Sequence, residues 1–456
     1  MISRLAPATI EATARPLSRF GVACGPRFFQ GFLVGLVWIV PALADARFIY
    51  ALLLWDALLI VAWFADVRRV PAASHLLVRR SWPAPPALSV RSSVRLELTS
   101  DARLPVRVQL VDTVPHQMRS SPPTIQATVA PRDELHFDYE IEPRERGDTP
   151  IGDVYLRYRS AWGIAERWAR AELAQTVLTY PNLEEARRES AFLVRSRQVD
   201  IERRTRRSRG AGRFFESLRE HQPGDELRDI CWTATARRGK LVTRLYQVEQ
   251  SQPIWIAIDS GRLMRARVDA VTKLDIAVNG ALSVARVASA SGDRVGLLTY
   301  GRQITHRLAP GRGASHQRDI VESLARVRGE EWEANHGHAA ARLALDQRRR
   351  SLVIWITDVP DVALTPDVIA AASQLTARHL VLFVVIAHHE LHRVAGRRPT
   401  TVDEMYETAA ANEMMARRDL LLNRLEARGA LTLEVTRNLS LSLVNAYLEV
   451  KQQNRL

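Results

Sequence analysis

The stretch Ile254–Tyr300, IWIAIDSGRLMRARVDAVTKLDIAVNGALSVARVASASGDRVGLLTY, decides the fold of the C-terminal half of this 456-residue chain. It begins with the uninterrupted apolar run Ile254–Ile258, which is typical of a strand buried on both faces. The pattern then predicts an amphipathic helix over Val271–Ala290 and a second buried strand over Arg294–Tyr300. A strand, a helix and a strand in this order indicate a parallel βαβ unit.

The same alternation continues to the C-terminus. Further strands and helices are predicted over Arg318–Arg328, Ser351–Thr357, Asp367–Ala377, Leu380–Ile386, Leu431–Val435 and Leu439–Gln453. Thr401-Val-Asp-Glu404 fits a capping box that opens a helix running to about Arg428. Residues 253–456 are therefore predicted to form a doubly wound, mostly parallel α/β domain. Such sheets bind ligands at the carboxyl ends of their strands, where Asp259 and Asp358 fall.

The region 81–182 predicts β-structure. Short runs of alternating apolar and polar residues recur, as in Val94–Leu98, Val106–Leu110 and Leu135–Tyr139. About seven short strands in about 100 residues favour an Ig-like β-sandwich. We expect an interaction or spacer module here.

Two apolar runs, Phe28–Ala44 and Phe48–Ala65, lie three residues apart near the N-terminus. Each is just long enough to cross a bilayer, so we predict a transmembrane helical hairpin over residues 28–66. Asp56 lies in the middle of the second run, and we expect it to face the partner helix or another subunit rather than lipid. An alternative is that the first run is a signal peptide cleaved near Ala42–Ala44, with the second run as the anchor.

The charge distribution gives the expected orientation. The chain has 64 basic and 50 acidic residues, a net charge of +14. Residues 1–80 hold nine arginines and four acids, and seven of these arginines flank the apolar runs: Arg15, Arg19, Arg27, Arg68, Arg69, Arg79 and Arg80. The positive-inside rule places the segment 1–27 and everything after the hairpin in the cytoplasm.

A second basic region, residues 195–245, holds fourteen basic and seven acidic residues. It belongs to a predicted Arg-rich connector and signature region over residues 183–252. The connector is either a solvated loop or an arm that binds nucleic acid or anionic lipid headgroups. Only Lys240, Lys273 and Lys451 are lysines, which a GC-rich coding bias explains, and two cysteines exclude a disulfide framework.

The most specific stretch is Gly212–Arg244, GRFFESLREHQPGDELRDICWTATARRGKLVTR. Its charges suggest a salt-bridged cluster around Trp232 that clamps the segment to the α/β domain, and Gly239 is expected to end a helical turn. This stretch resembles the bacterial family called domain of unknown function 58, with Thr235 in place of the usual serine. The residues that carry the signature, and that we expect to serve interactions, are Arg219, Gly224, Asp225, Arg228, Trp232, Ala236 and Arg237.

The resemblance implies a membrane-anchored protein whose C-terminal domain is similar to a von Willebrand factor type A domain. That fold binds Mg²⁺ through Asp-x-Ser-x-Ser, a threonine and a second aspartate. The corresponding positions here are Asp259, Gly261, Leu263, Ser315 and Asp358. Because both serines are lost, we expect a degenerate site without a metal. Arg262 is predicted to place its guanidinium where the metal would lie, neutralising Asp259 and Asp358.

The sequence therefore predicts a multidomain protein: a transmembrane hairpin, a β-sandwich and a von Willebrand A-like α/β domain. We expect no enzyme and no cofactor, since Gly239-Lys240 lacks the other residues of a Walker A loop. The resemblance implies an adaptor in the bacterial inner membrane that works with a MoxR-type AAA+ ATPase. The alternative is a nucleic-acid or anionic-lipid binder that uses residues 195–245.

Overall fold

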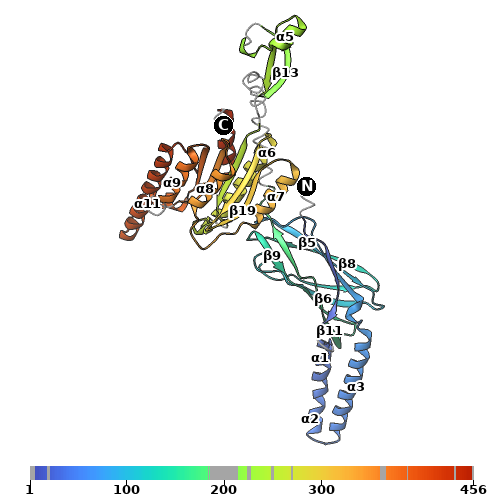
Figure 1. Ribbon diagram of the computed structural model, residues 1–456. Helices are drawn as coiled ribbons and strands as arrows, with labels where there is room; N and C mark the ends of the chain where they lie inside the picture. The colour runs from blue at the N-terminus through green and yellow to red at the C-terminus, as the bar shows by residue number, and fades with distance from the viewer. Residues whose placement is uncertain are drawn as a thin grey trace. The chain divides into compact units, whose positions relative to one another are not determined.

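The computed structural model describes residues 6–17, 21–182, 184, 214–222, 227–247, 251–268, 271–359, 366–387, 389–435 and 438–453. The chain divides into two compact units, Met1–Tyr180 and Pro181–Leu456 (Figure 1). Each unit has its own sheets and its own hydrophobic core.

Two antiparallel sheets form the body of the first unit. One has the order β1 (Ile10–Thr13), β4 (Leu76–Ser81), β5 (Ser92–Ser100) and β8 (Glu134–Ile141). The other has the order β2 (Arg15–Pro16), β11 (Ala165–Ala171), β10 (Val154–Arg159), β6 (Val106–Asp112) and β7 (Thr124–Val129), with β3 (Val22–Cys24) also paired to β11. β9 (Gly147–Ile151) pairs with β12 (Gln175–Thr179). Alternate residues of both sheets, such as Leu96 and Leu156, share one core.

The first unit takes in more of the chain than the predicted β-region, because strands from both sides of the two apolar runs belong to it. We expected residues 1–27 to be only a cytoplasmic segment, but β1 pairs with β4 and β3 pairs with β11. The two helices are therefore inserted between strands of one β-domain, which holds them at both ends.

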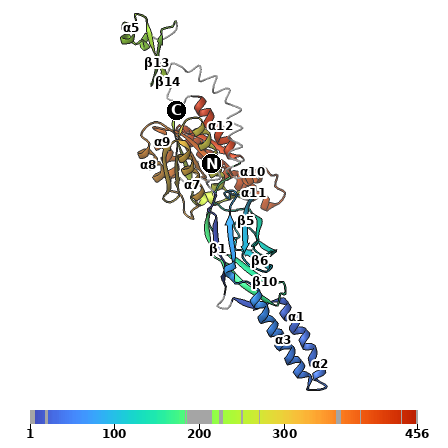
Figure 2. The same ribbon diagram turned by 90° about the vertical axis from the view of Figure 1, so that its right-hand side faces the viewer.

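The apolar runs form helices that lie side by side (Figures 1 and 2). The first run comprises α1 (Pro26–Gly35), η2 (Leu36–Trp38) and α2 (Ile39–Ala42), and the second is α3 (Phe48–Arg69). The Trp55 indole donates to the Gly31 carbonyl at 2.9 Å. A β-carbon on Gly35 would lie 2.6 Å from the Trp55 ring and 3.5 Å from Asp56 Oδ1, so this close approach requires glycine. Asp56 Oδ1 therefore lies on the side of α3 that faces α1.

The second unit is built on a six-stranded sheet. Its order is β19 (Ile304–Gly311), β18 (Arg294–Tyr300), β15 (Pro253–Asp259), β20 (Leu352–Thr357), β21 (Leu380–Ile386) and β22 (Leu431–Val435). All neighbours are parallel except β19, an antiparallel edge strand. The mixed α/β fold is as predicted, whereas β19, α8 (His336–Asp346) and α10 (His389–Ala395) were not predicted.

Helices cover both faces of this sheet. Trp255, Trp355 and Phe383 point to one face, where they pack with α8, α9 (Pro366–Thr376) and α11 (Val402–Ala427). Ile256 and Ile354, one residue along, are buried on the other face. That face is covered by α6 (Lys273–Ala290), which packs against α12 (Leu439–Gln452) and α7 (Gly313–Arg326). Burial on both faces is the reason why these strands are continuous apolar runs.

The family signature forms a small substructure of its own. β13 (Phe214–Glu220) and β14 (Val242–Gln247) make an antiparallel hairpin whose connection carries η4 (Leu227–Asp229) and α5 (Trp232–Arg238). Gly239 ends α5 with a φ of 68°, a left-handed conformation that favours glycine, as predicted.

Candidate functional site

Asp259 lies at the carboxyl end of β15, beside the end of the parallel neighbour β20. It is buried, with the Thr357 hydroxyl donating to Oδ2 at 2.6 Å and the Gly261 N–H donating to Oδ1 at 2.6 Å. Both carboxylate oxygens therefore already have a donor within the protein. The predicted approach of Asp259 and Asp358 follows from the strand register, since β20 ends one residue before Asp358.

Asp358 has a built-in cation. The Lys273 ammonium donates to Asp358 Oδ2 at 2.6 Å and to the Ile386 carbonyl at 3.1 Å, and the lysine is fully buried. Arg418 of α11 lies next to the pair, with Nη2 3.7 Å from Asp358 Oδ1 and Nε 3.2 Å from Glu434 Oε1. The carboxyl edge of the sheet thus holds a buried network in which Asp358 faces two cations.

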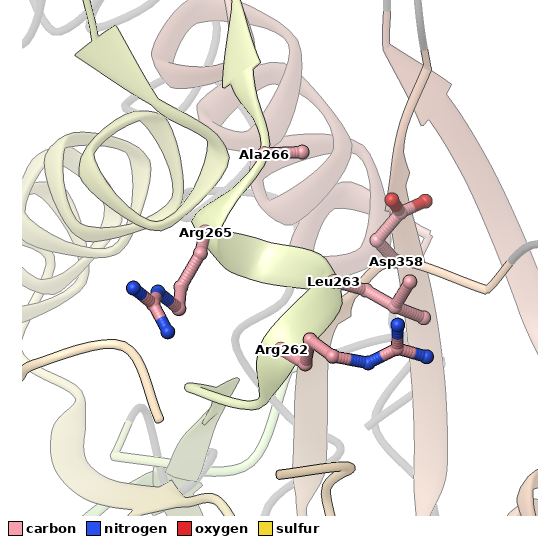
Figure 3. A pocket seen from close by; sticks show the side chains of 5 residues that line it. All are labelled: Arg262, Leu263, Arg265, Ala266 and Asp358. Atoms are coloured by element: carbon pink, nitrogen blue, oxygen red, sulfur yellow. The ribbon is translucent and has the colours of Figure 1, made fainter. Parts of the chain in front are cut away.

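The prediction for Arg262 is wrong. Arg262 lies on η5 (Arg262–Arg265), its side chain is 59% exposed, and Nη2 pairs with Glu333 Oε1 at 3.1 Å. In the view of Figure 3, the Leu263 side chain lies between the Arg262 guanidinium and the Asp358 carboxylate. The backbone explains this direction, because the Arg262 N–H is bound to the Trp332 carbonyl at 2.8 Å, next to Glu333. Lys273 supplies the cation instead.

The expectation for Ser315 is also wrong. Ser315 lies in the first turn of α7, and its neighbour His316 places Nε2 2.6 Å from the Val295 carbonyl oxygen. Val295 lies at the amino end of β18, whereas Tyr300 at the other end is the residue in register with Asp259. Ser315 therefore lies at the opposite edge of the sheet.

The segment 329–335 covers the loop that follows β15. The Glu330 N–H donates to the Ser260 carbonyl at 2.7 Å, and Arg265 pairs with Glu331 at 3.2 Å. A β-carbon on Gly261 would lie 2.8 Å from the Ala334 backbone nitrogen. A serine at position 261 would clash with backbone here, which gives a physical reason for the loss of that metal ligand.

The residues present do not fit Mg²⁺. That ion requires a near-octahedral set of oxygens. Both oxygens of Asp259 are engaged, Asp358 is paired with Lys273, and positions 261 and 263 offer no hydroxyl. Ser260 Oγ is buried without a hydrogen-bond partner among the described residues, but one hydroxyl cannot replace two lost ligands.

We expect the protein to bind neither Mg²⁺ nor Mn²⁺ at millimolar concentration, because both oxygens of Asp259 already accept hydrogen bonds and Asp358 is paired with Lys273. Isothermal titration calorimetry of the wild type and of Asp259→Ala checks this. Tight binding that disappears in Asp259→Ala would contradict the expectation.

The burial of Asp259 predicts a pH dependence of stability. Desolvation raises the pKa of its carboxyl from 3.8 to about 7, although the hydrogen bonds from Thr357 and Gly261 lower it. The folded state therefore binds the proton more tightly than the unfolded state. The contribution of Asp259 to the free energy of unfolding is greatest below pH 3.8, the pKa of the unfolded state. It falls as the pH rises from 3.8 to about 7 and stays constant above that.

Urea unfolding at several pH values, followed by hydrogen exchange of β15, measures this slope. Asp259→Asn should lower the stability but flatten the slope between pH 4 and 7. The exposed Asp319→Asn in α7 is the charge-matched control and should keep it. An unchanged slope in Asp259→Asn would assign the pH dependence to other groups.

A pocket of about 430 Å³ opens beside this network. It is lined by Arg262, Leu263, Arg265, Ala266 and Asp358 (Figure 3). Arg262 and Arg265 reach solvent while each holds one glutamate of the covering segment. Exchange of these exposed ion pairs for acidic groups of a partner costs little, because exposed pairs contribute about 0–1 kcal/mol each.

Of the signature residues, Arg219 lies on β13, and Trp232, Ala236 and Arg237 lie on α5. Gly224, Asp225 and the Arg228 side chain are outside the described residues. Part of the predicted cluster lies outside the described residues, and Trp232, its expected centre, is 67% exposed. Leu227 and Leu241 are exposed on the same hairpin connection, and Lys240 pairs with Glu220 at 3.1 Å. The described part of the module thus presents apolar side chains to solvent.

Lys273, Arg418 and Glu434 were not predicted as site residues. One signal for Lys273 was available, because it is one of three lysines among 64 basic residues. Nothing comparable distinguishes Arg418 or Glu434 from the other charged residues of their elements.

A protein family with a known sequence pattern matches the region that contains most of the signature. Residues 217–397 match the family described as "Protein of unknown function DUF58". Uncharacterized protein Rv1480 of Mycobacterium tuberculosis is 26% identical over 151 residues, which are 33% of this chain and 48% of that protein. Uncharacterized protein YeaD of Bacillus subtilis is 26% identical over 133 residues, 27% of this chain and 31% of that protein. The chain thus spans half or less of the length of these relatives.

Two solved structures are similar to part of the chain. The SpRpn10 VWA domain is 16% identical, with a TM-score of 0.27, and the match covers 43% of this chain and 95% of that one. The conserved hypothetical protein BatB from Bacteroides thetaiotaomicron is 14% identical, with a TM-score of 0.29, and covers 45% and 100%. Residues 217–397 are thus similar to the DUF58 family, and this match includes most of the signature from which the resemblance was predicted.

Proposed function

We propose that this protein is a membrane-anchored cytoplasmic adaptor whose von Willebrand A-like α/β unit binds protein partners. The observation that carries the proposal is the helix pair of the first unit. The segment Phe48–His75 is long and apolar enough to cross a membrane, with a mean hydropathy of 2.1 over its best window, and none of that window is buried. Side chains such as Leu54, Leu58 and Val61 need an apolar environment.

The arginines beside the helix ends support a cytoplasmic β-domain. Arg68 and Arg69 lie in the last turn of α3, and the Arg69 guanidinium lies 3.6 Å from the Trp162 ring centroid. A tryptophan and an arginine at a helix end are typical of the membrane–water interface. Arg80 does not add to this orientation signal, because it is fully buried in an ion pair with Asp112.

The sites proposed for partners are the carboxyl edge with its arginine-lined pocket and the exposed face of the signature module. Exposed tryptophan side chains often dominate the energy of protein interfaces. Trp232, with Leu227 and Leu241 nearby in the chain, offers such an anchor. The family resemblance implies a MoxR-type AAA+ ATPase as the partner, and this remains a proposal.

The test is affinity purification of the full chain from membranes in mild detergent, with and without ATP. A MoxR-type AAA+ ATPase should co-purify with the wild type and be lost with Trp232→Ala. Tyr406→Ala, an exposed aromatic residue of α11 outside both proposed sites, is the matched control and should retain it. If no AAA+ ATPase co-purifies either with or without ATP, the proposal of a MoxR-type partner is wrong.

The same preparation separates the adaptor from a phosphate-binding protein. Residues 195–213 and 223–226 of the Arg-rich region lie outside the described residues. Nucleic acid bound through phosphates should dissociate steeply between about 50 and 200 mM salt. Co-purified nucleic acid with that salt dependence, and no AAA+ ATPase, would favour the alternative function.

A further inference from the structure

A polar groove of about 600 Å³ lies on the outer face of the β2–β11–β10–β6–β7 sheet. Three arginines line it, Arg107 on β6 and Arg157 and Arg159 on β10, with Glu166 of β11 as the one acid. These four side chains give the lining a net charge of 3 − 1 = +2. Neither the family signature nor the proposed partner sites include any of them.

The strand register places two of these arginines face to face. Arg159 is the direct partner of Arg107 in the antiparallel ladder between β10 and β6. Side chains of such partners leave the same face of the sheet with their β-carbons about 5 Å apart. Like charges in this position destabilise a sheet, so an anion bound between the two arginines would stabilise it.

Glu166 is the direct partner of Arg159 in the β10–β11 ladder, but its carboxylate binds other groups. Its Oε2 lies 2.8 Å from Arg157 Nη2, and its Oε1 accepts from the Trp168 indole at 2.8 Å. Among the described residues, Arg107 and Arg159 have no ion-pair partner. The groove therefore contains two arginines in register whose charge is not balanced by the one acid of the lining.

Neutral hydrogen-bonding groups complete the lining. Thr128 is paired with Arg107 in the β6–β7 ladder, and Gln126 is paired with Gln109 one step along the same face. Two guanidinium forks with amide and hydroxyl donors around them match the several oxygens of a phosphate group. A carboxylate would use fewer of these donors.

The position of the groove indicates where the phosphate comes from. Pro26, the first residue of α1, is part of the lining, and α1 and α3 extend from this end of the β-domain (Figure 2). Arg27, the next residue, donates to the Trp162 carbonyl at 2.9 Å. The groove thus lies at the level where the proposed membrane helices leave the β-domain, next to a tryptophan suited to the interface.

We propose that this groove binds the phosphate of an anionic phospholipid headgroup, bridging Arg107 and Arg159. The inference rests on the proposed membrane insertion of α1 and α3. The helices themselves require only the apolar interior of a bilayer, whereas the groove would select anionic lipids among those around the helices.

The test uses the full chain in mild detergent with three probes: dihexanoyl phosphatidylglycerol, dihexanoyl phosphatidylcholine and inorganic phosphate. The first should raise the melting temperature of the first unit and bind at least about tenfold more tightly to the wild type than to Arg107→Gln/Arg159→Gln. Without any probe, the double variant should melt no lower than the wild type, because the like-charge contact is gone. Arg91→Gln/Arg103→Gln, two exposed arginines elsewhere on this unit, is the charge-matched control and should bind as the wild type does.

The outcomes test three things separately: the site itself, the lipid origin of the phosphate and the membrane anchor. Equal effects of all three probes, or equal binding by the double variant, would overturn the site. Equal binding of phosphatidylglycerol and inorganic phosphate would overturn the lipid assignment in favour of a soluble phosphate. Membrane insertion is measured separately, by flotation with phosphatidylcholine vesicles after an alkaline wash. The double variant should still float, whereas failure of the wild type to float would overturn the proposed anchor itself.

Discussion

Arg80→Ala should destabilise the first unit by about 3–5 kcal/mol, the cost of removing one partner of a buried ion pair. Arg80 is fully buried in β4. Its Nε donates to Asp112 Oδ2 at 3.1 Å, Nη1 donates to the Leu173 carbonyl at 2.7 Å and Nη2 donates to the Gly152 carbonyl at 2.9 Å. A second bond joins Nη2 to Asp112 Oδ1.

The loss is large because Asp112 stays behind as a buried charge. The Tyr139 hydroxyl still donates to it at 2.6 Å, but one neutral donor cannot replace a guanidinium. Arg80→Lys keeps the charge and loses the planar fork, so it should fall between the wild type and Arg80→Ala. The measurement is hydrogen exchange of β4 and β5 in increasing urea, which reports the opening of this unit alone.

Arg79→Ala is the matched control. Arg79 is the adjacent residue, but it points outward and pairs at the surface with Glu11 and Glu97. Its replacement should leave the stability of the unit nearly unchanged, because exposed ion pairs contribute little. Equal losses in Arg79→Ala and Arg80→Ala would show that the buried network does not hold the two sheets together.

Arg80 also marks a limit of sequence reasoning about the membrane hairpin. Because it lies close to the apolar run in the sequence, Arg80 was grouped with the arginines that flank the predicted hairpin. The alternation of buried and exposed residues along Leu76–Ser81 places Arg80 on the inward face with Leu76 and Val78. A buried arginine is expected only where an acidic side chain in the core can pair with it. That acid, Asp112, lies 32 residues away in the sequence.

The central sheet was predictable because its strands are apolar on both faces. β18, β21 and β22 have the predicted bounds, and β15 and β20 differ by one residue at one or both ends. The edge strand β19 was missed, since ITHRLAPG alternates polar and half-buried residues and carries a proline. An antiparallel edge has one neighbour and a solvent-facing side, so its sequence lacks the signal of a buried strand.

The location of Asp259 and Asp358 at the carboxyl edge of the sheet was predicted, whereas the cation beside Asp358 was not. The register of parallel strands fixes where Asp259 and Asp358 meet, so those two residues follow from the sequence. The direction of a side chain on a short turn does not, and Arg262 turns to Glu333 because its own N–H is bound to the covering segment. Lys273 reaches the site from the start of α6, which no local pattern connects to Asp358.

Lys273→Met should destabilise the second unit by about 3–5 kcal/mol, because the buried Asp358 loses its hydrogen-bonded cation and Arg418 stays 3.7 Å away. The stem of methionine fills similar space, so the loss reports the ammonium rather than a cavity. Desolvation lowers the pKa of Lys273, while Asp358 raises it. Hydrogen exchange of β15 and β20 in urea measures the effect. Lys240→Met, which removes a surface pair with Glu220, is the control and should change little.

Two further variants separate charge balance from shape. Lys273→Met/Asp358→Leu removes both charges of the pair and should recover most of the lost stability, because apolar replacements of a buried pair are often nearly neutral. Lys273→Arg keeps the charge but must fit a larger, planar group into a fully buried position, which costs about 1–3 kcal/mol. Such a cost would explain why this position is one of three lysines in a chain that otherwise uses arginine. If Lys273→Met is as stable as the wild type, the ammonium is not what balances the buried charge of Asp358.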